Sequence, residues 1–478
     1  MQKTLPALAA VFLVVIAAEV SALGSSSYKT IRLSGSIIHS FTVALDGSGD
    51  YTDIQSAINA IPSSSKGIVL IRQGVFDLNP AIKYPYKSIV VRSNLTIVGQ
   101  GIDKTIVRSF PTKQPYGSSI RAMSVTSTGN IQNLVLENLT IIQNGTPDNM
   151  GWSAIDLRGG TNTNIAIKNV KITDVTGAGI EIRRFDNVTV DNCTIERAFT
   201  GIALDGGNNG LIGGNRVVNT TGDGIFLQPM STWNLSVTDV AIERNYIENT
   251  GDTGIDVTSL SGLPPHERIN IEGNELINSH MRICYAHQVN VTDNILTNGY
   301  ISVDNGQGRP INVFVSRNII TTSTKVGIGF YGAENSSAIG NEINLTKPAG
   351  AIIQVGISAG IWGTGVVEGN TIVGSANYGI DFGGWGTGGE SRIVLRNNTI
   401  LDFGNIGIYD DNVSDGPVLV ENNTIWDRSS PFASYYGIRT DNVANAWIIR
   451  YNVVYAGSVA YISAPKSQVY GNTYKPPT

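Results

Sequence analysis

The chain has 478 residues, of which 41% are hydrophobic and 15% are charged, and its formal net charge is −5. The hydrophobic fraction is sufficient for a large core, which excludes a wholly disordered chain. The slight acidic excess argues against nucleic acid as a partner, because nucleic acids select a basic face.

The first 22 residues have the pattern of a secretory signal peptide. Lys3 precedes an apolar run over residues 5–18, and a small-residue cleavage site ends at Ala22. This pattern predicts a protein that is secreted or displayed at the cell surface, without membrane attachment after cleavage. The alternative is that the apolar run is retained as a membrane anchor. Residues 23–40 are predicted to form an exposed N-terminal segment.

A short amphipathic helix is predicted next, in the string TDIQSAINAIP. Thr52 and Gln55 have the spacing of an N-terminal capping box. The apolar residues of the string fall on one face of such a helix, namely Ile54, Ala57, Ile58 and Ile61. A helix of this kind can close the open end of a solenoid, so residues 41–110 are predicted to hold this cap and the first coils.

Two short phrases alternate along the rest of the chain, at intervals of roughly 18 to 30 residues. One is Asn followed by branched residues, and it recurs from Asn169 and Asn192 to Asn472. The other is Gly-Ile followed by an alternating strand. It begins at Gly179, Gly201, Gly224, Gly254, Gly327, Gly356, Gly379, Gly407 and Gly437, with degenerate copies at Ala154, Arg282, Tyr300 and Tyr461.

Each of these segments is too short to bury its own apolar face, whereas stacked coils bury it against their neighbours. The pattern predicts an all-β chain that folds as one single-stranded, right-handed parallel β-helix over residues 41–478, with repeat coils over residues 120–475. The isoleucines should stack inside the solenoid, and the asparagines should form a hydrogen-bonded ladder at a turn. A leucine-rich repeat and a β-propeller are excluded, because the leucine consensus and the longer four-stranded repeat are both missing.

The repeat region resembles the pectin-lyase-like superfamily of right-handed β-helices. Its opening, VALDGSGDYTDIQSAINAIP followed by IVLIRQGVF and LTIVGQGIDKTIV, is similar to the start of pectinesterases over residues 42–107. The resemblance implies the cap and the fold. The catalytic strings of pectinesterases are absent, so it implies no active-site residue here.

Strand alternation predicts which side chains of the Gly-Ile strands point outward, because every second residue lies on the same face. The outward positions of the early coils are rich in carboxylates and arginines. Asp156 and Glu181 should lie on adjacent coils with carboxylates about 5 Å apart, and Glu181 and Asp205 about 8 Å apart. The candidate catalytic residues are Asp156, Glu181, Arg183, Asp205 and Asp256, and the candidate substrate-binding residues are Arg158, Trp152 and Trp233.

Two chemistries fit this row, and a plain surface role is the structural alternative. Paired carboxylates serve an inverting glycosidase as acid and base. Clustered carboxylates instead bind Ca²⁺, with Asp156, Glu181 and Asp205 as ligands, and Arg183 or Arg184 would then be the base of a β-elimination.

The sequence offers further candidate groups. The same alternation predicts that the coil at Arg282 points Cys284 and Ala286 outward, although the two cysteines, Cys193 and Cys284, are expected to be small buried residues. A rival site would combine Asp381, Asp411 and Asp441 with Trp385 and Arg439, and a cluster of histidines would combine His266, His280 and His287. Sequons that could carry glycans include Asn94, Asn138, Asn144, Asn219, Asn234 and Asn335.

Together these features predict a secreted enzyme that acts on an extracellular, uronate-containing polysaccharide, either as a lyase or as a glycoside hydrolase. Polysaccharide is the expected partner, Ca²⁺ the candidate cofactor, and a monomer the expected state. The alternative is a non-catalytic surface or polysaccharide-binding β-helix.

Overall fold

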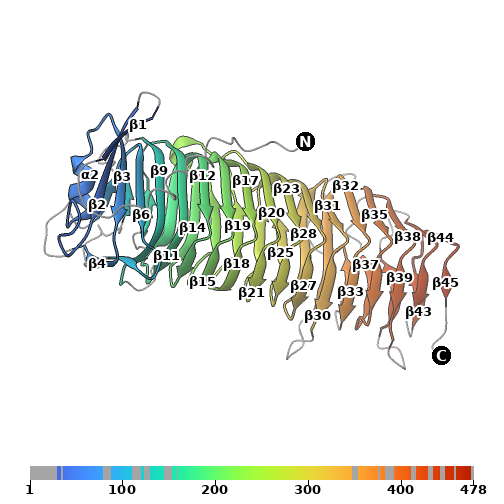
Figure 1. Cartoon of the computed structure of the whole chain (residues 1–478). Coiled ribbons are helices and arrows are strands. Elements are labelled where there is room, and N and C mark those ends of the chain that lie inside the picture. Colours follow the sequence, from blue (N-terminus) through green and yellow to red (C-terminus); the bar gives the residue numbers. More distant parts are fainter. Residues whose placement is uncertain are drawn as a thin grey trace.

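The chain forms an elongated parallel β-helix in which successive coils stack in chain order (Figure 1). The computed structural model describes residues 29–33, 36–78, 88–109, 120–122, 130–144, 153–158, 160–346, 354–374, 377–382, 392–410, 416–428, 434–441, 447–456 and 459–474. Within these ranges each coil contributes strands to three parallel sheets. The fold predicted from the repeat is therefore confirmed.

The Gly-Ile strands build the first sheet. Its strands are β5 (Ile89–Val91), β8 (Ile120–Ala122), β10 (Ile155–Leu157), β16 (Ile225–Gln228), β19 (Ile255–Thr258), β22 (Met281–Cys284), β25 (Ile301–Asp304), β28 (Val326–Glu334), β31 (Val355–Trp362), β34 (Tyr378–Asp381), β37 (Ile406–Asp410), β40 (Tyr436–Thr440) and β43 (Ala460–Ser463).

The second sheet follows in each coil. Its strands are β3 (Lys66–Ile71), β6 (Leu95–Gly99), β17 (Val237–Glu243), β20 (His266–Glu272), β23 (Ala286–Thr292), β26 (Ile311–Ser316), β29 (Ser337–Ile339), β32 (Thr364–Glu368), β35 (Arg392–Arg396), β38 (Val418–Glu421), β41 (Ile448–Arg450) and β44 (Gln468–Tyr470).

The third sheet completes the coil. Its strands are β4 (Gly74–Asp77), β7 (Thr105–Arg108), β13 (Thr194–Glu196), β15 (Arg216–Thr220), β18 (Tyr246–Thr250), β21 (Glu275–Ile277), β24 (Ile295–Thr297), β27 (Ile319–Thr322), β30 (Glu342–Leu345), β33 (Thr371–Gly374), β36 (Thr399–Leu401), β39 (Thr424–Trp426), β42 (Val453–Tyr455) and β45 (Thr473–Tyr474).

Four long strands bend from one sheet into the next. They are β9 (Ile131–Ile142), β11 (Asn162–Thr173), β12 (Ala178–Asp191) and β14 (Thr200–Gly213). The expected aliphatic stack is present inside the first sheet, where Ile180, Ile202 and Ile225 are in register and fully buried.

A buried asparagine ladder marks the corner between the second and third sheets. In each rung the Asn side chain donates to the side chain of the next Asn and to a backbone carbonyl, as Asn318 does to Asn341 and Val291. The residue before each rung has a left-handed backbone, for example Arg317 at φ 54°, which turns the chain sharply. The ladder runs from Asn215 to Asn472.

Two asparagines that were expected to belong to this ladder lie outside it. Cys193, not Asn192, occupies the first rung, where its backbone N–H donates to Asn215. Asn169 belongs to an outer pair and donates to Asn138. Cys193 and Cys284 are both free and buried, as was expected from their scarcity.

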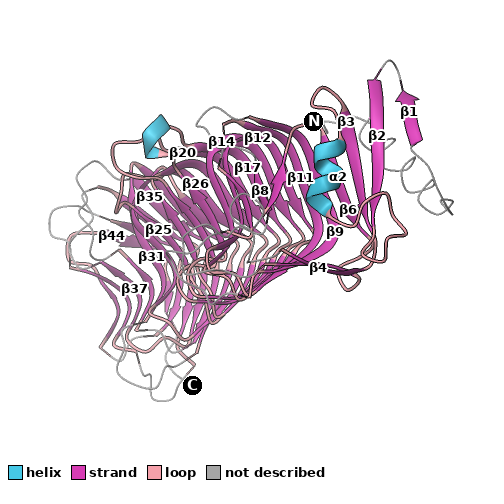
Figure 2. Ribbon diagram, turned by 90° about the vertical axis from the view of Figure 1, so that its left-hand side faces the viewer, coloured by secondary structure: helices cyan, strands magenta, loops and turns pink. Residues whose placement is uncertain are grey.

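The N-terminal end of the solenoid is covered by helix α2 (Ile54–Ala60) and strands β1 (Lys29–Leu33) and β2 (Ser36–Val43), as Figure 2 shows. The apolar face of α2 is buried as predicted, but its N-cap is Asp53, which accepts from the Ser56 N–H at 2.7 Å, and not Thr52. Residues 36–40 are not an exposed segment, because β2 pairs in parallel with β3 and Ile38 is buried.

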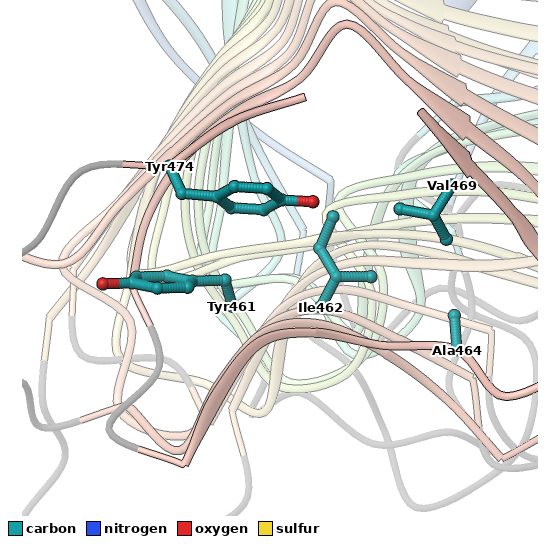
Figure 3. A pocket seen from close by; sticks show the side chains of 5 residues that line it. All are labelled: Tyr461, Ile462, Ala464, Val469 and Tyr474. Carbon is teal, nitrogen blue, oxygen red and sulfur yellow. The ribbon is translucent and has the colours of Figure 1, made fainter. Parts of the chain in front are cut away.

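The C-terminal end of the described chain is open. A cavity of about 430 Å³ lies at the end of the core, and Figure 3 shows the side chains around it. It is lined by Tyr461, Ile462, Ala464, Val469 and Tyr474. Among the residues that the structure describes, no helix has the length and apolar character needed to cross a membrane.

Candidate functional site

The outer face of the first sheet places the predicted site residues in register. Asp156 lies beside Glu181, and Arg183 lies beside Asp205. Further along the same row, Asp256 lies between Phe226 and Arg282. The neighbour relations predicted from the repeat are therefore confirmed for the early coils.

The N-terminal cluster consists of Asp156, Arg158, Glu181, Arg183 and Asp205, in which acids and bases alternate. Arg158 pairs with Asp156 at 2.8 Å and with Glu181 at 3.1 Å. Arg183 pairs with Glu181 at 2.7 Å and with Asp205 at 2.9 Å. The cluster is one continuous network of ion pairs across three coils.

The carboxylates of this network do not point freely into solvent, contrary to expectation. Asp156 and Asp205 are only 2% and 3% exposed, and Glu181 is 8% exposed. The reason is that each carboxylate packs beside a longer arginine side chain, and these arginines are about a third exposed. Alternation predicts the face of a sheet but not the depth of a side chain among its neighbours.

The network shifts the pKa values of its two central acids, Asp205 and Glu181, in opposite directions. Burial raises the pKa of Asp205 to about 7, and the Glu181 charge contributes to the rise. Although burial opposes it, Arg158 and Arg183 hold the pKa of Glu181 below its ordinary value. The carboxylates Glu181 and Asp205 likewise raise the pKa of Arg183 despite its burial, so Arg183 keeps its charge.

The donor set of this cluster does not fit a calcium site. Guanidinium groups lie between the three carboxylates that were expected to bind Ca²⁺. In the described part of the chain, no three His, Cys, Asp or Glu side chains come close enough to hold a metal ion. A cation would first have to displace an arginine.

A second group, the central cluster, lies on the next coils of the same sheet: Asp223, Asp252, Asp256, Arg282 and Asp304. Asp256 accepts a hydrogen bond from the Thr258 hydroxyl. Asp223 accepts from the Thr253 N–H at 3.1 Å, and Arg282 pairs with Asp304 at 3.1 Å. Within the described ranges, neither Asp223 nor Asp256 forms an ion pair of the kind that fixes Glu181.

Two carboxyl groups of the central cluster hold protons unusually well. Burial raises the pKa of Asp256 to about 7, and the negative charges of Asp223 and Asp252 add to the effect. Burial also raises the pKa of Asp223 to about 6. Between about pH 6 and pH 7 the pair therefore contains Asp256 mostly in its protonated form beside Asp223 mostly in its ionised form.

An aromatic pair, His280 and Tyr300, lies next to this cluster. Their rings stack with centroids 4.4 Å apart and planes 7° apart, and His280 Nε2 is 3.5 Å from the Thr253 hydroxyl. The register places both residues at the position that Gly254 holds one coil earlier. At most other coils this position is Gly.

This exchange of Gly for aromatic residues explains an error in the predicted alternation. Without the Gly-Ile phrase, the coil was aligned two residues too late, which keeps the face of each residue but shifts its position along the strand. Cys284 does lie in the outer row, between Thr258 and Asp304, but it is buried there. Ala286 does not belong to this strand, because it begins β23 of the second sheet, and it is buried as well. The alternation of Met281 and Ile283, both buried, was the signal that would have placed Arg282 beside Asp256.

The two tryptophans proposed for substrate binding have different outcomes. Trp233 ends the short 3-10 helix η1 (Ser231–Trp233), is 49% exposed, and lies 4.5 Å from the Arg184 guanidinium. The residue that its ring contacts, Arg184, directly follows Arg183 of the N-terminal cluster in the chain. Trp152 lies outside the described residues.

The rival acidic row is described only in part. Asp381 lies in the outer row two coils from Arg439, which is paired with Asp441 at 2.8 Å. Asp411 and Trp385 lie outside the described ranges. The three histidines are not gathered into one cluster. His266 is buried and accepts from the Val237 N–H, and burial lowers its pKa to about 4. His287 lies on β23 of the second sheet beside Glu267, away from His280.

These features define the class of the protein: it belongs to the right-handed β-helix family. The family model described as "Right handed beta helix region" matches residues 124–296 and 352–475. A second model, described as "Pectinesterase", matches residues 40–174.

Individual relatives of known sequence match only short stretches of this chain, and the similar solved structures have the fold in common with it. A probable pectinesterase/pectinesterase inhibitor 6 of Arabidopsis thaliana is 37% identical over 103 residues, which are 20% of this chain and 18% of that protein. A pectinesterase/pectinesterase inhibitor of Ficus pumila var. awkeotsang is 43% identical over 67 residues, 14% of this chain and 11% of that protein. The chain thus spans less than a fifth of the length of these two relatives.

Solved structures are similar to this chain at low sequence identity. The pre-mature gene product 12 of bacteriophage phi29 superposes with a TM-score of 0.54 at 13% identity, over 87% of this chain and 55% of that one. The A-module of the mannuronan C-5 epimerase AlgE6 of Azotobacter vinelandii gives a TM-score of 0.48 at 16% identity, over 89% and 95%.

Proposed function

We propose that this protein is a secreted enzyme that hydrolyses glycosidic bonds of an extracellular polysaccharide, with Asp256 as the general acid and Asp223 as the base that activates water. The observation that carries the proposal is the pair of neighbouring acids whose pKa values rise to about 7 and about 6. The pectinesterase-like opening and the predicted signal peptide support an extracellular glycan as substrate.

We propose that the two acids act with inversion. Asp223 is aligned with Thr253, three residues before Asp256 on the adjacent coil, which places the α-carbons roughly 11 Å apart, so side chains that lean toward each other bring the carboxyl groups closer than that. Inverting enzymes keep their carboxyl groups about 6.5–9.5 Å apart so that water fits between them. Protonation of the leaving oxygen by Asp256 and proton removal from water by Asp223 would then occur together.

Elimination is the weaker alternative for the same sheet. A lyase needs a base that is free to take a proton, whereas Arg183 is paired with two carboxylates that raise its pKa. Glu181 and Asp205 remain the second candidate centre, because their pKa values move in opposite directions. We propose that the N-terminal cluster mainly holds the early coils in position.

The test is polymer cleavage by purified protein, measured both as new reducing ends and as unsaturated products. We expect reducing ends without unsaturation, a rate maximum between about pH 6 and 7, and a loss of about 10²–10⁴-fold in Asp256→Asn. Asp239→Asn is the matched control, since Asp239 is a surface acid paired with Arg268.

Three results would contradict the proposal. Full activity of Asp256→Asn together with loss in Glu181→Gln would move the centre to the N-terminal cluster. Unsaturated products would indicate a lyase. Binding without cleavage across neutral and acidic polymers would indicate the non-catalytic alternative.

A further inference from the structure

His280 and Tyr300 replace the glycine that stands at the start of most strands of the first sheet. At Gly327, Gly356 and Gly379 an added Cβ would lie within 2.8 Å of a backbone oxygen of the next coil. The chain nevertheless carries two large rings at this position on consecutive coils, and both stay partly exposed. The rings form a ridge at the start of their strands, two residues before the row in which Arg282 lies beside the proposed acid Asp256.

The surroundings of the ridge are acidic. Four carboxyl groups, those of Asp223, Asp252, Asp256 and Asp304, share the area with one guanidinium, that of Arg282. Arg282 is already paired with Asp304. A ligand that brought further carboxylates would meet like charges, and among the described residues of this area no unpaired cation offsets them.

From this arrangement we infer that the central cluster selects an uncharged glycan, one sugar of which packs its C–H face against the ridge of His280 and Tyr300. The inference rests on the proposed function and narrows its substrate from polysaccharides in general to neutral or carboxyl-esterified ones. It departs from the uronate polymer expected from the sequence. The ridge residues are positioning residues, because they orient a sugar beside Asp256 without exchanging a proton with it.

The repeat itself supplies the variants for a test. His280→Gly and Tyr300→Gly restore the residue that most other coils carry, so the coil should fold. Tyr461→Gly is the matched control, because Tyr461 follows Gly437 at the same position in the last described coil, remote from the acids. Circular dichroism and melting temperature check that each variant is folded.

The measurement is equilibrium binding to Asp256→Asn protein, which separates binding from turnover. The probes are neutral glucan, mannan and galactan oligosaccharides, together with oligogalacturonate and its fully methyl-esterified form, in calcium-free buffer of low ionic strength. We expect a neutral probe to bind at least about tenfold more tightly than oligogalacturonate. Each ridge variant should weaken that binding about 3- to 10-fold, and Tyr461→Gly should leave it unchanged.

The outcomes distinguish this inference from the proposed function. Binding of oligogalacturonate as tight as that of every neutral probe overturns the inference, even if the polymer is hydrolysed. Equal affinity of the ridge variants and the parent protein also overturns it. Neutral binding that depends on the ridge, with no cleavage by the parent protein, supports the inference and rejects hydrolysis. Absence of binding to every probe rejects both.

Discussion

The buried asparagines are the residues on which the coils depend most directly. Asn318 donates to Val291 and Asn341, and its side-chain oxygen accepts from both nitrogens of Asn294. These groups are buried, so loss of the amide leaves partners without hydrogen bonds in a place that water does not reach. An unsatisfied buried polar group costs about 1–3 kcal/mol.

We therefore expect Asn318→Ala to lower the free energy of unfolding by about 2–4 kcal/mol, measured by denaturant unfolding. Asn270→Ala is the control, because Asn270 is partly exposed and its side chain bonds only to Glu272 in the described contacts. Its effect should stay within about 0.5 kcal/mol. Equal losses in the two variants would show that the ladder adds nothing to stability.

A second prediction concerns the substitution Asp256→Asn, which should lower activity but raise the stability of the fold. Its folded pKa of about 7 lies above the ordinary value of 3.8. The folded state thus holds a proton that the unfolded state releases, so stability falls as pH rises from about 4 to about 7. Above that range the folded state bears the full cost of the buried charge.

Asparagine cannot ionise, so Asp256→Asn should be more stable than the parent protein at pH 8 by about 1–3 kcal/mol. At pH 4 the gain should vanish. Thermal unfolding at both pH values measures the difference. Asp239→Asn should show no such gain, since Arg268 lowers the pKa of Asp239. A gain for Asp256→Asn at pH 4 as large as at pH 8 would contradict the assigned cause.

For single residues, the sequence predicted which side chains lie side by side better than it predicted how deeply each side chain is buried. Asp156 beside Glu181 followed from counting between Gly-Ile phrases. The burial of Asp205 did not, because it depends on how Arg183 folds over it. Arg282 was missed because His280 replaces the Gly from which the count starts.

Among the elements, the strands of the first sheet depend on close approach at their first residue. A Cβ at Gly379 would lie 2.4 Å from the Ile400 side chain and 2.6 Å from the Gly407 oxygen. Neighbouring coils at the sheet spacing leave no room to relieve both contacts.

Gly379→Ala should therefore destabilise the protein by about 1–3 kcal/mol. The control is Gly213→Ala, where the nearest atom to an added Cβ is 3.6 Å away. The melting temperature of each variant measures the effect. If Gly379→Ala melts at or above the control, close packing is not the reason for glycine there.

The predicted helix and strands are present, but the residues at which some of them begin or end differ from the prediction. Helix α2 formed on the expected apolar face because its residues repeat with helical spacing. Its cap moved to Asp53, whose carboxylate reaches Ser56, and capping geometry is not evident from spacing alone. Strand β2 was missed because its partner β3 lies about 30 residues further along the chain.

For the whole molecule, stability should decline toward the open end. Each coil touches only its neighbours, so a coil with one neighbour has about half of the stacking contacts. The N-terminal end is covered by α2, whereas β43, β44 and β45 have partners on one side only in the described chain.

Amide hydrogen exchange should therefore be faster in β43–β45 than in β22–β25, by at least about tenfold. Mass spectrometry of peptides from both regions measures it, and β3 provides a control for a covered end. Uniform protection along the rod would indicate that the solenoid opens as a single unit or that the open end is occupied in solution.

The position of the cap has a consequence during synthesis. A ribosome releases the N-terminal end first, so α2 and the opening coils emerge as a finished template while later coils are still being translated. Each new coil can then pair with the strands of the coil before it. Only the unpaired strands of the last coil are exposed to incorrect pairing with other chains. A rod built in this direction avoids the slow search that long-range strand pairing normally requires.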